Sequence, residues 1–217
     1  DPVAYAKMAL SKENSDNPVS PQMIIDRQIQ EGLPTSQIGL LSKDESVMAA
    51  NDFLSLNTSQ EKMSYIMDRE REMGNLYPIY ASDLLNKNKG GVDPAYKIAF
   101  MADLNNSDEA AFVEKYLDSV NEFPNYITPE GNAKGTAEIY KDNFKNIEES
   151  ILNDSDFKRI IDVVNLEGVP SNDVANSMIN YAKYYYVTDK AHNEDKAVEV
   201  ATNWFKNKFN DLIQPTA

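Results

Sequence analysis

The residues of this chain that could carry chemistry are few in kind, because it has no cysteine and a single histidine. Without cysteine there is no disulfide, no thiol nucleophile and no thiolate metal site. A Ser–His–Asp triad would have to use His192, and a metal site built from several histidines is impossible. His192 lies in a polar stretch, residues 189–195, between two predicted helices. We interpret it as a solvated loop histidine near a helix N-terminus.

Carboxylates are abundant, with 35 acidic residues in the 217 of the chain. A glycosidase needs two carboxyl groups held about 5–10 Å apart across a sugar cleft. Close pairs arise by chance at this density, and two of the four named below lie at predicted helix starts, where the helix dipole favours negative charge. We therefore assign no catalytic role to the close pairs, which are Glu70 and Glu72, Asp108 and Glu109, Glu148 and Glu149, and Glu194 and Asp195.

One stretch, Asp103-Leu104-Asn105-Asn106-Ser107-Asp108, alternates oxygen-bearing side chains as an EF-hand loop does. It lacks the glycine at the sixth position and a correctly placed glutamate at the twelfth. A helix cap with Ser107 as the capping residue is the simpler interpretation. The sequence thus predicts no metal site and no cofactor site.

A run of tyrosines lies near the middle of the carboxy-terminal half. Aromatic side chains of this kind can stack on bases or sugars. On a helix, however, Tyr181 and Tyr185 would fall on the core face, while Tyr184 would point elsewhere. Three consecutive tyrosines, ending at Tyr186, leave at least one partly exposed, which favours a protein–protein contact.

The net charge of −14 argues against nucleic acid as a partner, since such binders neutralise phosphates with Lys and Arg. The densest basic stretch, Lys206-Asn207-Lys208, is short and begins two residues after Trp204. We predict that the chain binds proteins or itself. The predicted interaction residues are Tyr184, Tyr186, Lys206 and Lys208. No apolar run approaches the roughly 18–20 residues of a membrane-spanning helix.

The elements that would position these residues are helices. Two S/T-x-x-E capping boxes, at 42–45 and 58–61, each precede apolar residues at helical spacing. Ser20-Pro21 and Asp93-Pro94 combine a capping side chain with a proline at the first helical position. Only eight glycines occur, which disfavours sandwiches and barrels with their frequent turns.

Apolar stripes extend the same pattern over the whole chain. Tyr140, Phe144, Ile147 and Ile151, for example, recur at the spacing of one helical face. We predict an all-α fold of about eleven short to medium helices. It would form two lobes, 1–122 and 136–217, joined by an irregular connection at 123–135, or else a single domain.

Glu149-Ser150-Ile151-Leu152-Asn153 resembles the Glu-Ser-x-x-Asn signature around the acid of lysozyme-like lytic transglycosylases. The resemblance implies an alternative function, a divergent peptidoglycan lytic transglycosylase with Glu149 as its acid. Nothing after Asn153 matches the downstream Gly-Leu-Met-Gln stretch of that family. Ile147 and Ile151 also belong to an apolar stripe, so we favour a structural role for this segment.

A second resemblance covers about the first half of the chain. It is similar to a helical segment of the very large internal, or ejected, structural proteins of tailed phages and prophages, some of which carry a lytic transglycosylase domain elsewhere. The similar stretches are 39–45, 53–56, 58–62, 77–80 and 93–96. The resemblance implies a non-enzymatic structural module, part of a longer polypeptide, in the virion or the host cytoplasm. A secreted or surface helical binding module is a third possibility.

Overall fold

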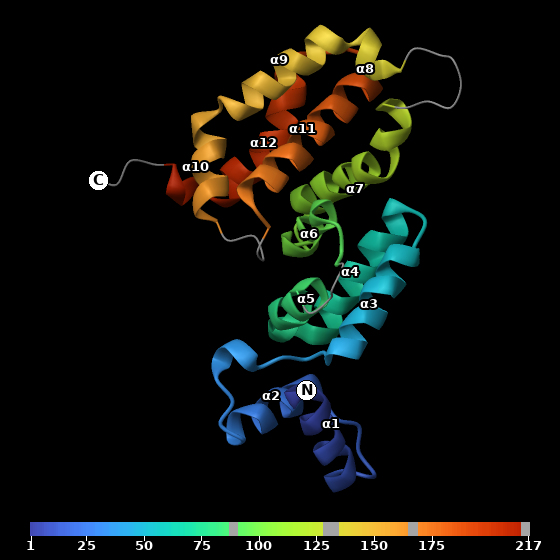
Figure 1. The fold of residues 1–217 in the computed structure, drawn as a ribbon, viewed down its shortest axis with the longest axis vertical. Coiled ribbons are helices and arrows are strands. Elements are labelled where there is room, and N and C mark those ends of the chain that lie inside the picture. Colours follow the sequence, from blue (N-terminus) through green and yellow to red (C-terminus); the bar gives the residue numbers. More distant parts are fainter. Residues whose placement is uncertain (87–90, 128–134, 165–168, 214–217) are drawn as a thin grey trace. The chain divides into compact units, whose positions relative to one another are not determined.

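The computed structural model describes residues 1–86, 91–127, 135–164 and 169–213 (Figure 1). Within these ranges the chain folds into helices and 3-10 turns and contains no β-strand, so the predicted all-α fold is confirmed. No helix in the same ranges is both long and apolar enough to cross a membrane.

Contacts divide the chain into two compact units, residues 1–92 and residues 93–217. This division differs from the predicted connection at 123–135. The helix α7, Ser107–Ile127, continues through the first part of that stretch, and residues 128–134 lie outside the described part. Phe123 is 3% exposed, and its ring centroid lies 6.4 Å from that of Phe144. Tertiary burial of this ring therefore supports the helix beyond the point at which the nearby prolines and glycines predicted its end.

The first unit contains five α-helices within its described residues. Both predicted capping boxes are complete, with Ser42 and Thr58 each accepting from the third helical N–H and the glutamate bonding back. Contacts join α1 to α2, and α5 to α3 and α4. The helices are α1 (Pro2–Glu13), α2 (Pro21–Gln30), α3 (Lys43–Ser55), α4 (Ser59–Met73) and α5 (Tyr77–Asn86), with 3-10 turns at Thr35–Gln37 and Gly74–Leu76.

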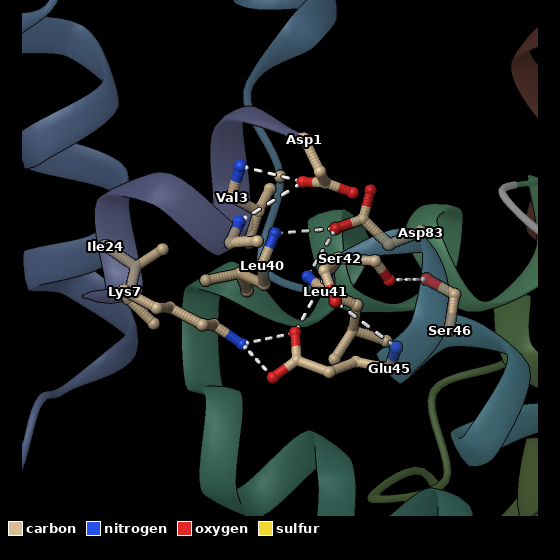
Figure 2. A network of polar contacts seen from close by, with 12 residues as sticks. Asp1, Val3, Lys7, Ile24, Leu40, Leu41, Ser42, Glu45, Ser46 and Asp83 are labelled. Carbon is tan, nitrogen blue, oxygen red and sulfur yellow. Dashed lines mark hydrogen bonds and ion pairs between the residues drawn. The ribbon is translucent and has the colours of Figure 1, made fainter. Parts of the chain in front are cut away.

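A buried polar network holds the non-helical segment between α2 and α3 (Figure 2). Asp83 of α5 is 6% exposed, and its Oδ2 accepts from the N–H groups of Leu40 at 2.6 Å and Leu41 at 2.9 Å. The amide of Gln28 donates to the Gly39 carbonyl at 2.7 Å and accepts from the Gly39 N–H at 3.0 Å. Side chains thus supply partners to backbone groups that no helix satisfies.

The same network ties α1 to the start of α3. Lys7 Nζ lies 2.8 Å from Glu45 Oε2, and Asp1 Oδ2 accepts from the Lys43 N–H at 2.8 Å. Burial opposes the charge on Glu45, but hydrogen bonds from Lys7 and from the Ser42 N–H keep the pKa of its carboxyl below the ordinary value. Figure 2 shows Lys7 and Ser42 meeting at this carboxylate. The charged groups of Asp1, Lys7 and Glu45 therefore stabilise the packing of α1 against the start of α3.

The second unit is arranged around α11, which contacts α6, α7, α9, α10 and α12 (Figure 1). The central position of α11 explains why residues on several of its sides are buried, among them Val174, Ser177 and Ile179. The remaining bounds are α6 (Pro94–Lys97), α8 (Thr136–Ile139), α9 (Lys141–Leu152), α10 (Ser155–Val163), α11 (Ser171–Thr188) and α12 (Glu194–Lys208), with 3-10 turns at Ala99–Met101 and Asn210–Leu212.

Candidate interaction groove

A groove of about 460 Å³ in the second unit is formed by residues of α7 and α12 with Tyr181 of α11 between them. We call it the Trp204 groove. Its volume falls within the range of about 300–1,000 Å³ that is usual for ligand sites. Its lining residues are Asn106, Asp108, Glu109, Ala111, Phe112 and Lys115 on the α7 side, Tyr181 of α11, and Val200, Asn203, Trp204, Asn207 and Lys208 on α12.

Three aromatic rings form the apolar part of the groove. The rings of Phe112 and Trp204 stack with centroids 5.3 Å apart and an interplanar angle of 3°, and Phe112 meets Tyr181 edge-on at 5.5 Å. Tyr181 and Trp204 are buried, whereas Phe112 is half-buried. Burial raises the pKa of Tyr181 well above its ordinary value, so the phenol stays neutral. The ring packing makes this part of the groove rigid.

Glu109 links the two walls at one end of the groove. Its Oε2 accepts from Trp204 Nε1 at 3.1 Å, from Lys208 Nζ at 3.0 Å and from the Asp103 N–H at 2.8 Å. Lys208 Nζ also lies 5.3 Å from the centroid of the Trp204 ring. This carboxylate thus orients the indole of Trp204 and the ammonium group of Lys208, and its role is structural.

Replacing Glu109 with glutamine should lower the free energy of unfolding of the second unit by about 1–2 kcal/mol, because hydrogen bonds to a charged group are worth about 1.5–3 kcal/mol each and the amide oxygen retains part of them. Trp204 is the single tryptophan of the chain, so its fluorescence during urea unfolding reports the change. Glu114→Gln, at an exposed position on the same helix, is the control. Equal unfolding midpoints for the two variants would contradict the linking role.

The rim of the groove is polar. Asp108 and Lys115 are exposed on α7, and in the described part of the structure neither side chain has a hydrogen-bonding or ionic partner. On α12 the rim carries the amides of Asn203 and Asn207, of which Asn203 donates to Glu199 Oε1 at 3.3 Å. An aromatic floor with a polar rim is the arrangement found at protein interfaces.

The structure separates the four predicted interaction residues. Of these four, Lys208 alone lines the groove. Lys206 forms an ion pair with Asp154, the N-cap residue of α10, and so ties α12 to α10. Tyr184 is half-buried, and its hydroxyl donates to Glu122 Oε2 at 2.8 Å.

Tyr186 requires a correction, since it was expected on an exposed face and is 5% exposed. Its ring centroid lies 5.4 Å from that of Tyr140 and 5.4 Å from that of His192. The face of α11 that carries Ala182 and Tyr186 is buried, and Phe144 of α9 contacts Tyr186, whereas Tyr185, predicted for the core, is half-buried. Packing around α11 on several sides widens the buried face beyond the predicted stripe, so that it includes Tyr186 as well as Tyr181.

His192 lies in the loop between α11 and α12 and is exposed, where the sequence analysis placed it. Its φ of 43° is in the left-handed region. The ring Nδ1 lies 2.8 Å from the Tyr186 carbonyl oxygen, so Nδ1 carries the hydrogen and donates. The ring also stacks on Tyr140 at 5.6 Å. These contacts are those of a side chain that closes a turn.

The other candidates for chemistry have structural surroundings. Glu149 is exposed, with Lys145 Nζ at 3.8 Å from its Oε1. The cap of α7 is Asn106, whose Oδ1 accepts from the N–H groups of Asp108 and Glu109, and the predicted capping residue Ser107 is the first helical residue. Across the described ranges, no group of three or more His, Asp or Glu side chains could hold a metal ion.

Of the residues that line the groove, Lys208 beside Trp204 was predicted from the sequence as an interaction residue, whereas the opposite wall on α7 was not predicted. Asp108, Phe112 and Lys115 follow one another at spacings of four and three residues, which is one helical face. In the sequence, Asp108 stood out only as one of a close acidic pair, and neither Phe112 nor Lys115 was singled out. The signal that could have found the wall is an aromatic residue flanked by opposite charges on one face.

Comparison with protein-family models, with curated proteins and with solved structures finds no match for this chain.

Proposed function

We propose that this chain is a non-enzymatic structural module of a larger phage or prophage virion protein, and that it holds a neighbouring protein in the Trp204 groove. The observation that carries the proposal is the composition of the groove, an aromatic floor between rims of charge and amide. Aromatic residues at the centre and polar residues at the edge are what a docked protein segment requires. The virion context comes from the resemblance of 39–45 and the following stretches.

The surroundings of the acidic residues also support a structural role. Glu45 and Glu61 complete capping boxes, Asp83 accepts from two backbone N–H groups, and Glu109 accepts from three donors. Each of these carboxylates is used by the fold. A secreted or surface binding module would use the same groove. The two functions differ in which protein the groove binds.

Photo-crosslinking from the groove tests the proposal. A benzophenone amino acid at Asn207, on the rim, should form an adduct with a defined virion protein in particles of a phage or prophage that encodes the chain. The control is the same amino acid at Asn172, an exposed residue in the first turn of α11 that does not line the groove. Mass spectrometry identifies the adduct. The same adduct from both positions, or adducts with non-virion proteins alone, would contradict the proposal.

The enzymatic alternative has its own decisive outcome. The chain should leave a peptidoglycan suspension turbid, because Glu149 is exposed on α9 beside Lys145. If the unaltered chain cleared the suspension and Glu149→Gln did not, a lytic transglycosylase would replace the structural module as the function.

A further inference from the structure

Resting on that proposed function, we infer that the segment held in the Trp204 groove is an amphipathic α-helix of the partner protein. On the face that enters the groove it carries an acidic side chain and, seven residues later, a basic one, with apolar residues between them. The pairing of Asp108 and Lys115 along one wall of an aromatic groove carries this inference.

The walls of the groove are two antiparallel helical faces. Glu109 bonds to Lys208, and Phe112, further along α7, stacks on Trp204, which is earlier in α12. The two helices therefore run in opposite directions. Within α7 the lining residues run from Asp108 to Lys115, seven positions apart, and on α12 they run from Val200 to Lys208, eight positions apart. Seven residues of helix extend about 10 Å. A groove two turns long between two helices is filled lengthwise by a third helix, which presents apolar residues at helical spacing.

The charges determine which helix fits. Asp108 and Lys115 stand at opposite ends of the α7 wall, both exposed and, among the described residues, without a side-chain partner. The facing rim on α12 offers the neutral amides of Asn203 and Asn207 and, near the Asp108 end, the Lys208 ammonium group, whose charge is paired with Glu109 Oε2 at 3.0 Å. The occupant therefore places a basic group beside Asp108 and an acidic group beside Lys115, since the reverse arrangement sets like charges together.

The direction of the occupant follows from helix dipoles. Asp108 lies in the first turn of α7, at the positive end of that dipole. A helix antiparallel to α7 brings its own C-terminal half to this end, where a basic side chain is favourable, and its N-terminal half to Lys115, where an acidic one is favourable. The expected pattern is Glu-x-x-Leu-Leu-x-x-Lys, in which both leucines lie on the face of the charges.

Two designed peptides test this pattern on the whole chain. Each is an alanine-rich, lactam-stapled helix without tryptophan, one carrying Glu-x-x-Leu-Leu-x-x-Lys and the other Lys-x-x-Leu-Leu-x-x-Glu. Fluorescence of Trp204, the single tryptophan of the chain, reports binding. The first peptide should bind about tenfold more tightly than the second, because exchanging two partly exposed ion pairs for two like-charge contacts changes the binding constant by about that factor.

The double variant Asp108→Lys with Lys115→Glu should reverse the preference. Both residues are exposed, so the circular dichroism spectrum should stay unchanged and show that the variant is folded, while the lysine in the first turn of α7 should lower the free energy of unfolding by no more than about 1 kcal/mol. Reversal supports the inference. Equal binding of the two peptides, no binding of either, or a preference that the double variant leaves unaltered overturns it. Quenching of Trp204 by a chitooligosaccharide with no response to the peptides overturns it in favour of a saccharide site.

These outcomes are separable from those of the proposed function. A virion protein crosslinked from Asn207, together with equal binding of the two peptides, would remove the helical occupant and leave the structural module standing. A clear preference for the first peptide, together with no virion adduct, would uphold the helix-binding groove and remove the virion context.

Discussion

Replacing Asp83 with alanine should lower the free energy of unfolding of the first unit by about 2–5 kcal/mol, because each buried donor that loses its acceptor costs about 1–3 kcal/mol. The carboxylate is 6% exposed and accepts from the N–H groups of Leu40 and Leu41 (Figure 2). Leu40 itself is 2% exposed, so its amide has little access to solvent that could take the place of the carboxylate. The loss is large because one side chain accepts from two consecutive backbone N–H groups that lie outside the helices.

Urea unfolding followed by circular dichroism measures this loss, and hydrogen exchange at the Leu40 and Leu41 amides locates it. Trp204 belongs to the other unit, so its fluorescence should not follow the change. Asp83→Asn keeps one acceptor oxygen and should cost less than alanine. The matched control is Asp68→Ala, on an exposed part of α4, which should change the stability by less than about 0.5 kcal/mol. An equal effect of Asp83→Ala and Asp68→Ala would contradict the role of the network.

Alkaline pH should unfold both units. Burial raises the pKa of four tyrosines well above the ordinary value of 10, two in each unit: Tyr77, Tyr80, Tyr116 and Tyr181. The unfolded chain releases these protons near pH 10, whereas the folded chain retains them, so their contribution to stability is complete below pH 10 and is lost as the pH rises above it. Each tyrosine then removes about 1.4 kcal/mol per pH unit, or about 3 kcal/mol per pH unit in each unit.

Lys62 acts in the opposite direction in the first unit. Burial lowers the pKa of its ammonium group, so the folded state releases this proton first and gains stability as the pH rises toward 10.5. One lysine cannot offset two tyrosines at higher pH. The first unit should therefore begin to lose stability at a higher pH than the second, and it should still unfold.

Tyrosinate absorbance and circular dichroism during a pH titration test this expectation together. The two signals should change cooperatively, because the buried phenols ionise only on unfolding. Tyr116→Phe should reduce the pH slope of the second unit by about 1.4 kcal/mol per pH unit, since it removes one strongly raised pKa there and leaves that of Tyr181. Tyr5→Phe, at a residue that is 55% exposed, should leave the slope unchanged. Ionisation of all twelve tyrosines near pH 10 without unfolding would contradict the prediction.

The features that were predictable from the sequence depend on neighbours within one helical turn. In the box at 58–61, the Thr58 hydroxyl and the Glu61 carboxylate complete a cap between residues three positions apart, and the structure contains both bonds. The same holds for Ser42 and Glu45. These two helix starts follow from such local contacts, whereas the cap of α7 is Asn106 and not the predicted Ser107.

Which sides of a helix are buried depends on the helices packed around it and not on its own sequence neighbours. For this reason the prediction for Tyr186 was wrong. Tyr186 was expected at the surface because the stripe through Tyr181 and Tyr185 looked like the core face. α11 contacts five other helices of its unit, so more of its circumference is buried than one stripe. The prediction for Phe123 failed as well, because it placed this residue in an irregular connection. The contact that buries Phe123 in the helix is with Phe144, which is distant in the sequence.

The Trp204 groove belongs entirely to the tertiary structure. Its two walls come from α7 and α12, and the Trp204 indole bonds to a carboxylate 95 positions earlier in the chain. Capping and periodicity could specify each helix alone, because their energies arise between residues at most a few positions apart. Asp108 and Lys115 line one groove together with aromatic rings only because α7 packs against α11 and α12. Contacts within α7 alone do not determine that arrangement.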